Sequence, residues 1–207
     1  RNLQNRFCNR GGIQIHPQEY DPWQVIRANS DVSHRRTEHP GFEGLALDDA
    51  LGWLDQYKHW SFAPLAKALA AVAREYAGRE DISVLELGCG GGGLRTLLGC
   101  CGVHGYLGID ANPIAFCYSP FITEAPEHYR LLNLQESIDF GFRFDLVCSF
   151  EVLEHIREDA LDAFLSTIAS HMDSTSLFVG TASLIDSYDV HVTVRERAWW
   201  LSRFERF

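Results

Sequence analysis

A glycine-rich segment at residues 88–93 follows a short apolar run and carries the residue types best suited to ligand chemistry. Glycine permits positive φ angles and close approach of the backbone to a ligand at little cost. Amides at the start of a following helix would then face an anionic or polar ligand. Asp110 ends the next apolar run, at the spacing from which a carboxylate accepts hydrogen bonds from ribose hydroxyls. The spacing therefore favours a nucleotide-like ligand over glycines that only make a tight turn.

Two kinds of ligand fit this segment. Gly88, Gly90 and Gly93 match G-x-G-x-x-G, which alone is a weak indication of a nicotinamide dinucleotide site. Glu86 together with Gly88, Gly90 and Gly92 matches E-x-G-x-G-x-G. A carboxylate just before the glycines is badly placed beside a pyrophosphate, but it suits an ammonium group such as that of S-adenosylmethionine. These residues favour S-adenosylmethionine and leave the dinucleotide as the alternative.

Three strings in order resemble the class I, Rossmann-like S-adenosylmethionine-dependent methyltransferases that act on small molecules. The strings are VLELGCGGGG (84–93), YLGIDANP (106–113) and FDLVCSFEVLEHI (144–156), and the last is the most specific. The resemblance covers about residues 45–205. It implies that S-adenosylmethionine is the cofactor and S-adenosylhomocysteine the product. The cofactor contacts that it implies are Tyr57, Glu86, Gly88, Cys89, Gly90, Gly92, Asp110, Ala111, Asn133, Leu134 and Phe150.

The region of the adenine contact departs from the family pattern. Members commonly place an aspartate at the end of the third strand, where this chain has Asn133 and Leu134. The side-chain carbonyl of Asn133 is one candidate acceptor for the adenine amino group. The backbone of Leu134 is the other candidate contact.

The resemblance places the methyl acceptor beside Glu151 and His191. Either residue is a candidate base for the proton that leaves an acceptor oxygen, since neutral imidazole suits that role near pH 7. The alternative interpretation of His191 is an exposed loop histidine without a catalytic role. The alternative interpretation of His155, in the turn after the fourth strand, is that it caps or packs at a helix start. His59 is a lesser rival for the base.

The elements that must position these residues alternate between strands and helices. This order predicts a doubly wound α/β fold, in which a parallel sheet carries helices on both faces. Ligands of such sheets bind outside the carboxyl ends of the strands. The expected strands are 82–87, 105–110, 128–134, 144–150 and 176–182, and the expected helices are 93–98, 113–116, 160–171 and 196–207.

The chain divides into an irregular N-terminal arm at 1–45 and an S-adenosylmethionine-binding methyltransferase domain at 46–207, in which 46–80 form a helical cap. The resemblance implies two further strands after Phe207, so we expect the natural protein to continue there. A further domain or a homo-oligomer is compatible with this organisation.

Composition narrows the class of partner. The formal charge of −10 argues against a nucleic-acid backbone as the main partner. No run of 18 apolar residues is present, so a membrane span is not expected. The six cysteines form no C-x₂-C pair, so we expect neither a metal site nor a disulfide framework. Reduced thiols indicate a cytoplasmic protein.

We therefore expect a methyltransferase acting on an oxygen or nitrogen of a small molecule of sugar or natural-product type. An RNA or protein methyltransferase is the second interpretation, supported only by the arginines of the arm. A non-catalytic S-adenosylmethionine-binding module of a larger assembly is the third. The identity of the acceptor depends on the arm and the loops.

Overall fold

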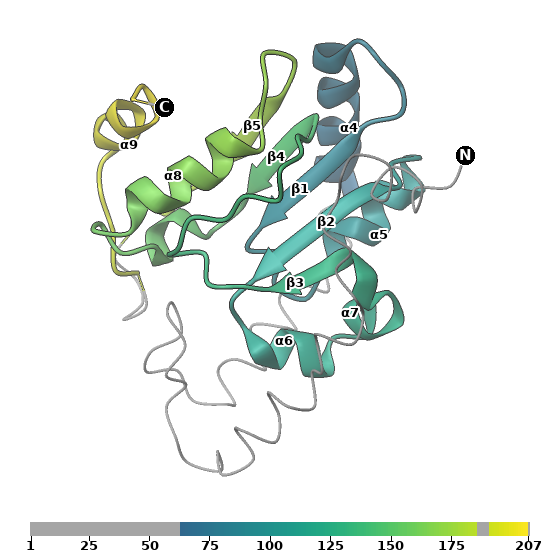
Figure 1. Ribbon diagram of the computed structural model, residues 1–207, viewed down its shortest axis with the longest axis horizontal. Helices are drawn as coiled ribbons and strands as arrows, with labels where there is room; N and C mark the ends of the chain where they lie inside the picture. Colours follow the sequence, from purple (N-terminus) through teal and green to yellow (C-terminus); the bar gives the residue numbers. More distant parts are fainter. Residues whose placement is uncertain (1–62, 186–190, 207) are drawn as a thin grey trace.

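The structure is a computed structural model that describes residues 63–185 and 191–206. In this part of the chain, five parallel strands form one sheet in the order β3-β2-β1-β4-β5 (Figure 1). The predicted doubly wound α/β fold is confirmed. The strands are β1 (Ser83–Leu87), β2 (Gly105–Asp110), β3 (Tyr129–Leu131), β4 (Leu146–Ser149) and β5 (Leu177–Gly180).

The helices lie on both faces of the sheet. The described helices are α4 (Ala63–Ala77), α5 (Gly93–Cys100), α6 (Pro113–Tyr118), α7 (Pro120–Glu124), α8 (Leu161–Ser170) and α9 (Arg197–Phe204), with short 3₁₀ turns η3 (Pro126–His128) and η4 (Leu153–His155). Helices α4 and α5 cover one face, and α8 and α9 the other. None of the helices in the described part has the length and apolar character needed to cross a bilayer.

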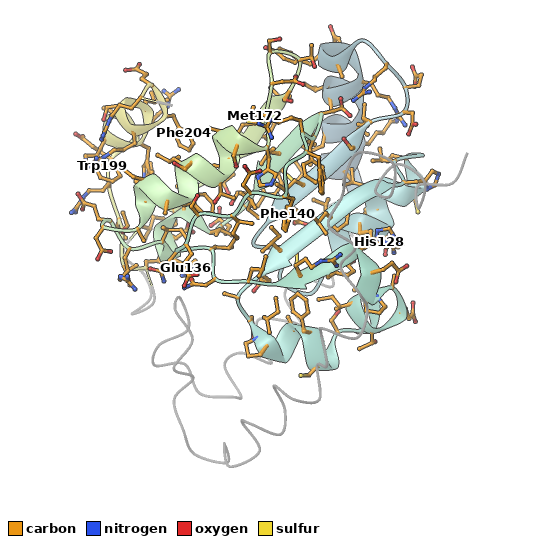
Figure 2. All side chains as sticks on the ribbon, viewed as in Figure 1. His128, Glu136, Phe140, Met172, Trp199 and Phe204 are labelled. Atoms are coloured by element: carbon orange, nitrogen blue, oxygen red, sulfur yellow. The ribbon has the colours of Figure 1, made fainter. Side chains whose placement is uncertain are left out.

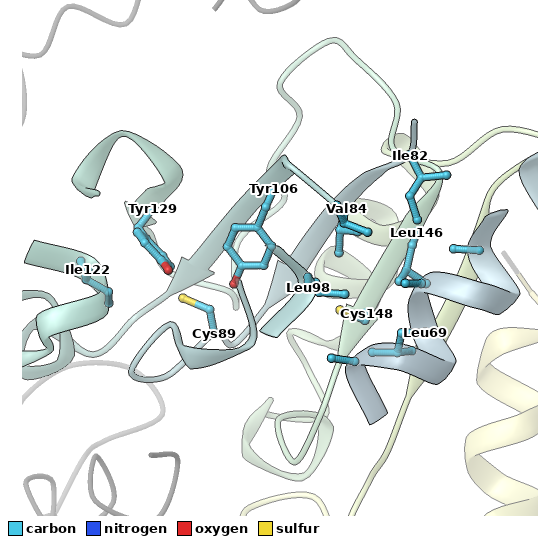
Figure 3. Packing of buried hydrophobic residues seen from close by; sticks show 14 of the residues in the cluster. Leu69, Ile82, Val84, Cys89, Leu98, Tyr106, Ile122, Tyr129, Leu146 and Cys148 are labelled. Carbon is cyan, nitrogen blue, oxygen red and sulfur yellow. The ribbon is translucent and has the colours of Figure 1, made fainter. Parts of the chain in front are cut away.

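Alternation of side chains along the strands creates two cores. Val84 and Tyr106 point toward α4 and α5, and Figure 3 shows this cluster from nearby. Leu85 and Ile109 point to the other face and pack against α8. Both cores are closed by residues from several helices, so the sheet is buried on both sides, as expected for parallel strands.

Helix α9 closes the second core through aromatic side chains. Trp200 is buried, and the ring of Phe204 stacks on Phe178 of β5 with centroids 5.3 Å apart. Trp199 and Phe204 are labelled on α9 in Figure 2. The guanidinium of Arg203 lies 4.6 Å from the centroid of Trp199, a cation–π contact. The C-terminal helix is thereby fixed against the sheet.

A buried carboxylate fixes the amino ends of β1 and β4. Asp145 accepts hydrogen bonds from the backbone amide of Ser83 (2.7 Å), the Ser83 hydroxyl (3.0 Å) and Arg79 Nε (3.0 Å). These contacts set the start of the two strands between which the order of the sheet reverses. Ligands of this fold bind at the other end of that pair.

Several expected bounds differ from the structure. The third strand ends at Leu131 because Asn133 forms a turn that leaves the sheet, and the amide of Gln135 donates to its side chain (3.0 Å). Helix α7 and η3 were not expected. The arm at 1–45 and the first part of the expected cap lie outside the described residues.

Candidate active site

The glycine segment makes a tight turn between β1 and α5. The amides of Gly88 and Cys89 both donate to the carbonyl of Ile109 on β2, at 2.7 and 2.9 Å. Gly88 has a φ of +83°, and a Cβ there would lie 2.1 Å from Cγ2 of Val152. Gly88 therefore satisfies two requirements that only glycine meets: a left-handed backbone, and direct contact with the loop after β4.

Side chains that lie outside the turn contact its later part. Gly92 has a φ of +77°, and a Cβ there would lie 2.7 Å from the ring of Tyr129. The Tyr129 hydroxyl donates to the Gly92 carbonyl at 2.8 Å, and the Ser119 hydroxyl donates to the Gly91 carbonyl at 2.5 Å. The turn is thus preorganised by β3 and by the residue before α7. Tyr129 and Ser119 were not among the predicted site residues.

Asp110 connects the end of β2 to the glycine turn. Its Oδ2 accepts from the Gly90 amide and its Oδ1 accepts from the Asn112 amide, both at 2.7 Å. Burial raises the pKa of Asp110, while these amides lower it. An ionised carboxylate can accept about four hydrogen bonds, so capacity for ligand hydroxyls remains. The structure brings Asp110 and the glycines together, as the sequence predicted.

Glu86 lies on β1, two residues before Gly88. Its carboxylate is buried and accepts a hydrogen bond from the Tyr106 hydroxyl. Burial raises the pKa of Glu86 to about 8; the Tyr106 bond lowers it, and the charge of Asp110 raises it. The carboxyl is therefore mostly protonated at neutral pH unless a cation approaches it.

Cys89 and Ala111 are buried beside these two acids. The Cys89 side chain lies in the first core with Tyr106 and Tyr129 (Figure 3). Burial raises the pKa of its thiol well above the usual value, so the thiol stays neutral. A ligand would therefore meet these two residues through their backbone. Tyr57 lies outside the described residues, as does His59.

The segment after β3 offers two amide side chains. Asn133 is occupied by its own turn: its Oδ1 accepts from the Gln135 amide, and its Nδ2 donates to Glu136 (2.9 Å). The Leu134 side chain is buried in the second core, which leaves its backbone for a ligand. Gln135 is 8% exposed, and neither polar atom of its side chain has a hydrogen-bond partner in the described part of the chain. Gln135 was not among the predicted site residues, because the sequence does not show that its side chain is buried.

The ends of β4 and β5 are joined by a pair of hydrogen bonds. Glu151 donates from its amide to the Thr181 hydroxyl (2.9 Å), and that hydroxyl donates to Glu151 Oε1 (2.7 Å). Glu151 has a φ of +53°, and it alone among the described non-glycine residues has a positive φ. Such strain often marks functional positions. Phe150, the preceding residue, packs against the first core.

His191 follows β5 and lies against the loop after β4. Its ring centroid is 5.0 Å from that of His155, at an interplanar angle of 81°. Glu154, next to His155 in η4, is fully buried. His191 and Glu151 thus both lie at the carboxyl ends of β4 and β5, the region predicted for them.

Comparisons with known sequences agree with this geometry. A family described as "Methyltransferase domain" matches residues 57–206. The mitochondrial ubiquinone biosynthesis O-methyltransferase of Mus musculus is 28% identical over 156 residues, which are 65% of this chain and 40% of that protein. The ubiquinone biosynthesis O-methyltransferase of Methylobacterium nodulans is 31% identical over 102 residues, 48% of this chain and 40% of that protein. The chain thus spans about 40% of the length of these curated relatives.

Solved structures share the fold. A TehB-like SAM-dependent methyltransferase from Corynebacterium glutamicum matches with a TM-score of 0.57 and 18% identity, over 77% of this chain and 82% of that one. DesVI from Streptomyces venezuelae matches with a TM-score of 0.52 and 17% identity, over 66% of this chain and 57% of that one. At these identities the likeness is one of architecture.

Proposed function

The chain belongs to the S-adenosylmethionine-dependent methyltransferases, and from this premise we propose that it transfers a methyl group to an oxygen or nitrogen of a small molecule. The contact between the Asp110 carboxylate and the Gly90 amide (2.7 Å) carries the cofactor part of this proposal. It joins the acid at the end of β2 to the turn after β1, which is where the fold binds its ligand. The relatives named as O-methyltransferases favour oxygen as the acceptor atom.

The residues present fit S-adenosylmethionine. Asp110 keeps lone pairs for the ribose hydroxyls, and Glu86 offers a carboxyl that an ammonium group would ionise. Gln135 offers a primary amide that has no hydrogen-bond partner among the described residues, and a primary amide can pair with both the amino group and a ring nitrogen of adenine. We therefore add Gln135 to Asn133 and Leu134 as an adenine contact. When bound, S-adenosylmethionine supplies an activated methyl on a sulfonium.

The acceptor belongs at the ends of β4 and β5. The protein's part in methyl transfer is to orient the acceptor and exclude water. Glu151 and His191 are the side chains placed to take a proton from an acceptor oxygen. An amine acceptor that is already neutral requires no such base.

Calorimetry with S-adenosylhomocysteine tests the cofactor assignment. Asp110→Ala should weaken binding by about 10- to 100-fold, since hydrogen bonds to a charged group contribute about 1.5–3 kcal/mol. Asp139→Ala is the matched control, because Asp139 accepts from the amide of Gly141 (2.8 Å) in an exposed turn of the same kind. Binding of NAD with no binding of S-adenosylhomocysteine would overturn the assignment.

Transfer of label tests the acceptor class. The chain is incubated with methyl-labelled S-adenosylmethionine and a set of catechols, other phenols and amines, and in parallel with fractionated cell extract. Label in the small-molecule fraction supports the proposal. Label confined to RNA or protein would contradict it and favour a macromolecular substrate.

A further inference from the structure

A buried tyrosine contacts the candidate cofactor site from inside the first core. Tyr106 on β2 is 1% exposed, and its hydroxyl donates to Oε2 of Glu86 on β1. Figure 3 shows the hydroxyl end of Tyr106 pointing toward Cys89 of the glycine turn. The bond uses one oxygen of the Glu86 carboxyl, so the other oxygen, Oε1, keeps its capacity to accept from a ligand.

Gly108 provides the space for this contact. The register of β1 and β2 places Gly108 opposite Glu86. Tyr106 comes two residues earlier on the same face of β2, so its ring must extend over position 108 to reach Glu86. A Cβ at Gly108 would lie 2.8 Å from the Tyr106 hydroxyl and 2.9 Å from the Cβ of Cys89. Glycine inside a strand often marks such a close approach, and here a side chain would displace the hydroxyl from the Glu86 carboxyl.

The charge of Glu86 is opposed by most of its surroundings. Burial raises the pKa of Glu86 most, the bond from Tyr106 lowers it, and the charge of Asp110 on β2 raises it further. Three more titratable groups interact with this charge, from the glycine turn, β4 and β3: Cys89, Cys148 and Tyr129. Burial raises the pKa of each of them, so they stay neutral near pH 7. Among these groups, Tyr106 is the one that favours the ionised form of Glu86.

Tyr106 keeps the proton that it donates. Burial raises the pKa of Tyr106 well above its usual value, and the charge of Glu86 raises it further. A hydrogen bond to an ionised group is about twice as strong as one between neutral groups. The hydroxyl therefore binds the carboxylate form of Glu86 more tightly than the carboxyl form, and it fixes the orientation of the group.

We propose that Tyr106 is a positioning residue for the cofactor, whose hydroxyl holds the Glu86 carboxylate for the ammonium group of S-adenosylmethionine. This role rests on the proposed function, in which Glu86 receives that ammonium group. When the ligand binds below about pH 8, Glu86 must lose its proton. The bond from Tyr106 makes this loss less costly, so Tyr106 acts on the ligand through Glu86.

The ratio of two affinities tests the proposal. Calorimetry gives the Kd of S-adenosylhomocysteine for the parent and for Tyr106→Phe from pH 6.5 to pH 9.5, and the ratio cancels the titration of the ligand itself. Tyr106→Phe should weaken binding by about tenfold at pH 6.5, because the charge-assisted bond that favours ionised Glu86 is lost. At pH 9.5 the two proteins should differ by less than about twofold, because Glu86 is then largely ionised in both.

Tyr129→Phe is the matched control. Tyr129 lies in the same core, with its ring centroid 5.8 Å from that of Tyr106, and its hydroxyl donates to the Gly92 carbonyl. Any change of affinity in this variant should be the same at every pH, because a backbone carbonyl does not titrate. A factor that is likewise constant with pH for Tyr106→Phe would overturn the proposal, since Tyr106 would then act only by packing.

The titration of Glu86 in the ligand-free chain gives a second measurement. Glutamate labelled with ¹³C at the side-chain carboxyl is followed by NMR, and the signal that Glu86→Gln removes is that of Glu86. Its midpoint should be about pH 8 in the parent and higher in Tyr106→Phe. A midpoint that is equal or lower in the variant would overturn the proposal, while normal S-adenosylhomocysteine binding by the parent would leave the proposed function intact. A parent that binds no S-adenosylhomocysteine at any pH would overturn the proposed function and the role of Tyr106 with it.

Discussion

Replacement of Glu86 by Gln should stabilise the protein at high pH and not at low pH. Burial raises the pKa of Glu86 from 4.5 to about 8. Such a change makes the ionised form about 5 kcal/mol less favourable in the folded than in the unfolded chain. Between these two pKa values the folded state binds the extra proton. Stability contributed by neutral Glu86 is therefore complete below about pH 4.5 and is lost as the pH rises toward 8.

Urea unfolding at pH 5, 6.5 and 8 measures this effect. The free energy of unfolding of Glu86→Gln should exceed that of the parent by an amount that grows by about 1.4 kcal/mol per pH unit in this range. The amide keeps an acceptor for the Tyr106 hydroxyl, so the difference isolates the charge. The thiols of Cys89 and Cys148 face the same carboxylate, and burial keeps both neutral.

Glu75→Gln is the control, because Glu75 is exposed on α4 and its replacement changes the charge without changing a buried group. It should show no growing difference. Parallel pH curves for the parent and Glu86→Gln would refute the reasoning, since Glu86 would then have the same pKa in both states.

Binding of a ligand ammonium group beside the Glu86 carboxyl should release a proton. If Glu86 holds the ammonium group of S-adenosylhomocysteine, binding at pH 7 should release about 0.9 proton from a group with a pKa of about 8. Calorimetry in phosphate and in Tris, which differ in heat of ionisation, counts this proton. Release should vanish in Glu86→Gln. A binding heat that is the same in both buffers for the parent would exclude contact between Glu86 and the ammonium group.

Three further substitutions test contacts that stabilise the fold. Gly88→Ala should lower the free energy of unfolding by about 2–4 kcal/mol, because a Cβ there adds a clash to the strain of the left-handed backbone. Gly78→Ala, at a φ of +64° with open space around it, should lower it by about 1 kcal/mol, and urea unfolding compares the two variants. Asp145→Ala should cost about 2–4 kcal/mol by the same assay, since it leaves a buried amide and an arginine without their acceptor. Burial lowers the pKa of His171, so the stability that His171 contributes should fall as the pH drops below about 6.5, and the free energy of unfolding of His171→Phe should rise relative to that of the parent; thermal unfolding at pH 5 and 7 would contradict this if both proteins changed equally in stability.

The sequence predicted the sheet because local patterns determine it. Buried parallel strands are largely apolar runs; the one at 83–87 is followed by Gly88, and the one at 105–110 ends at Asp110. The third strand was predicted too long because Leu132 and Leu134 extend its apolar pattern. Leu134 instead enters the second core from a turn. Helix α7 is only five residues long and begins at Pro120, so it shows no helical period.

The closeness of Glu86, the glycines and Asp110 was predictable for a similar reason. These residues lie at the carboxyl ends of two strands that follow one another in the sequence and pair directly in the sheet. The cluster of Glu154, His155 and His191 was not predictable by the same means. Its members come from segments that only the pairing of β4 with β5 brings together.

The two halves of the site are in direct contact through one residue pair. Val152 packs against the Cα of Gly88 so closely that no Cβ fits between them. Val152 is followed directly by η4, which carries Glu154 and His155, and Gly88 opens the turn that Asp110 holds. A side chain at position 88 would therefore displace the loop after β4 as well as the glycine turn. The position of the loop after β4 relative to the glycine turn thus depends on glycine at this contact, which is a requirement beyond the backbone freedom that the motif implies.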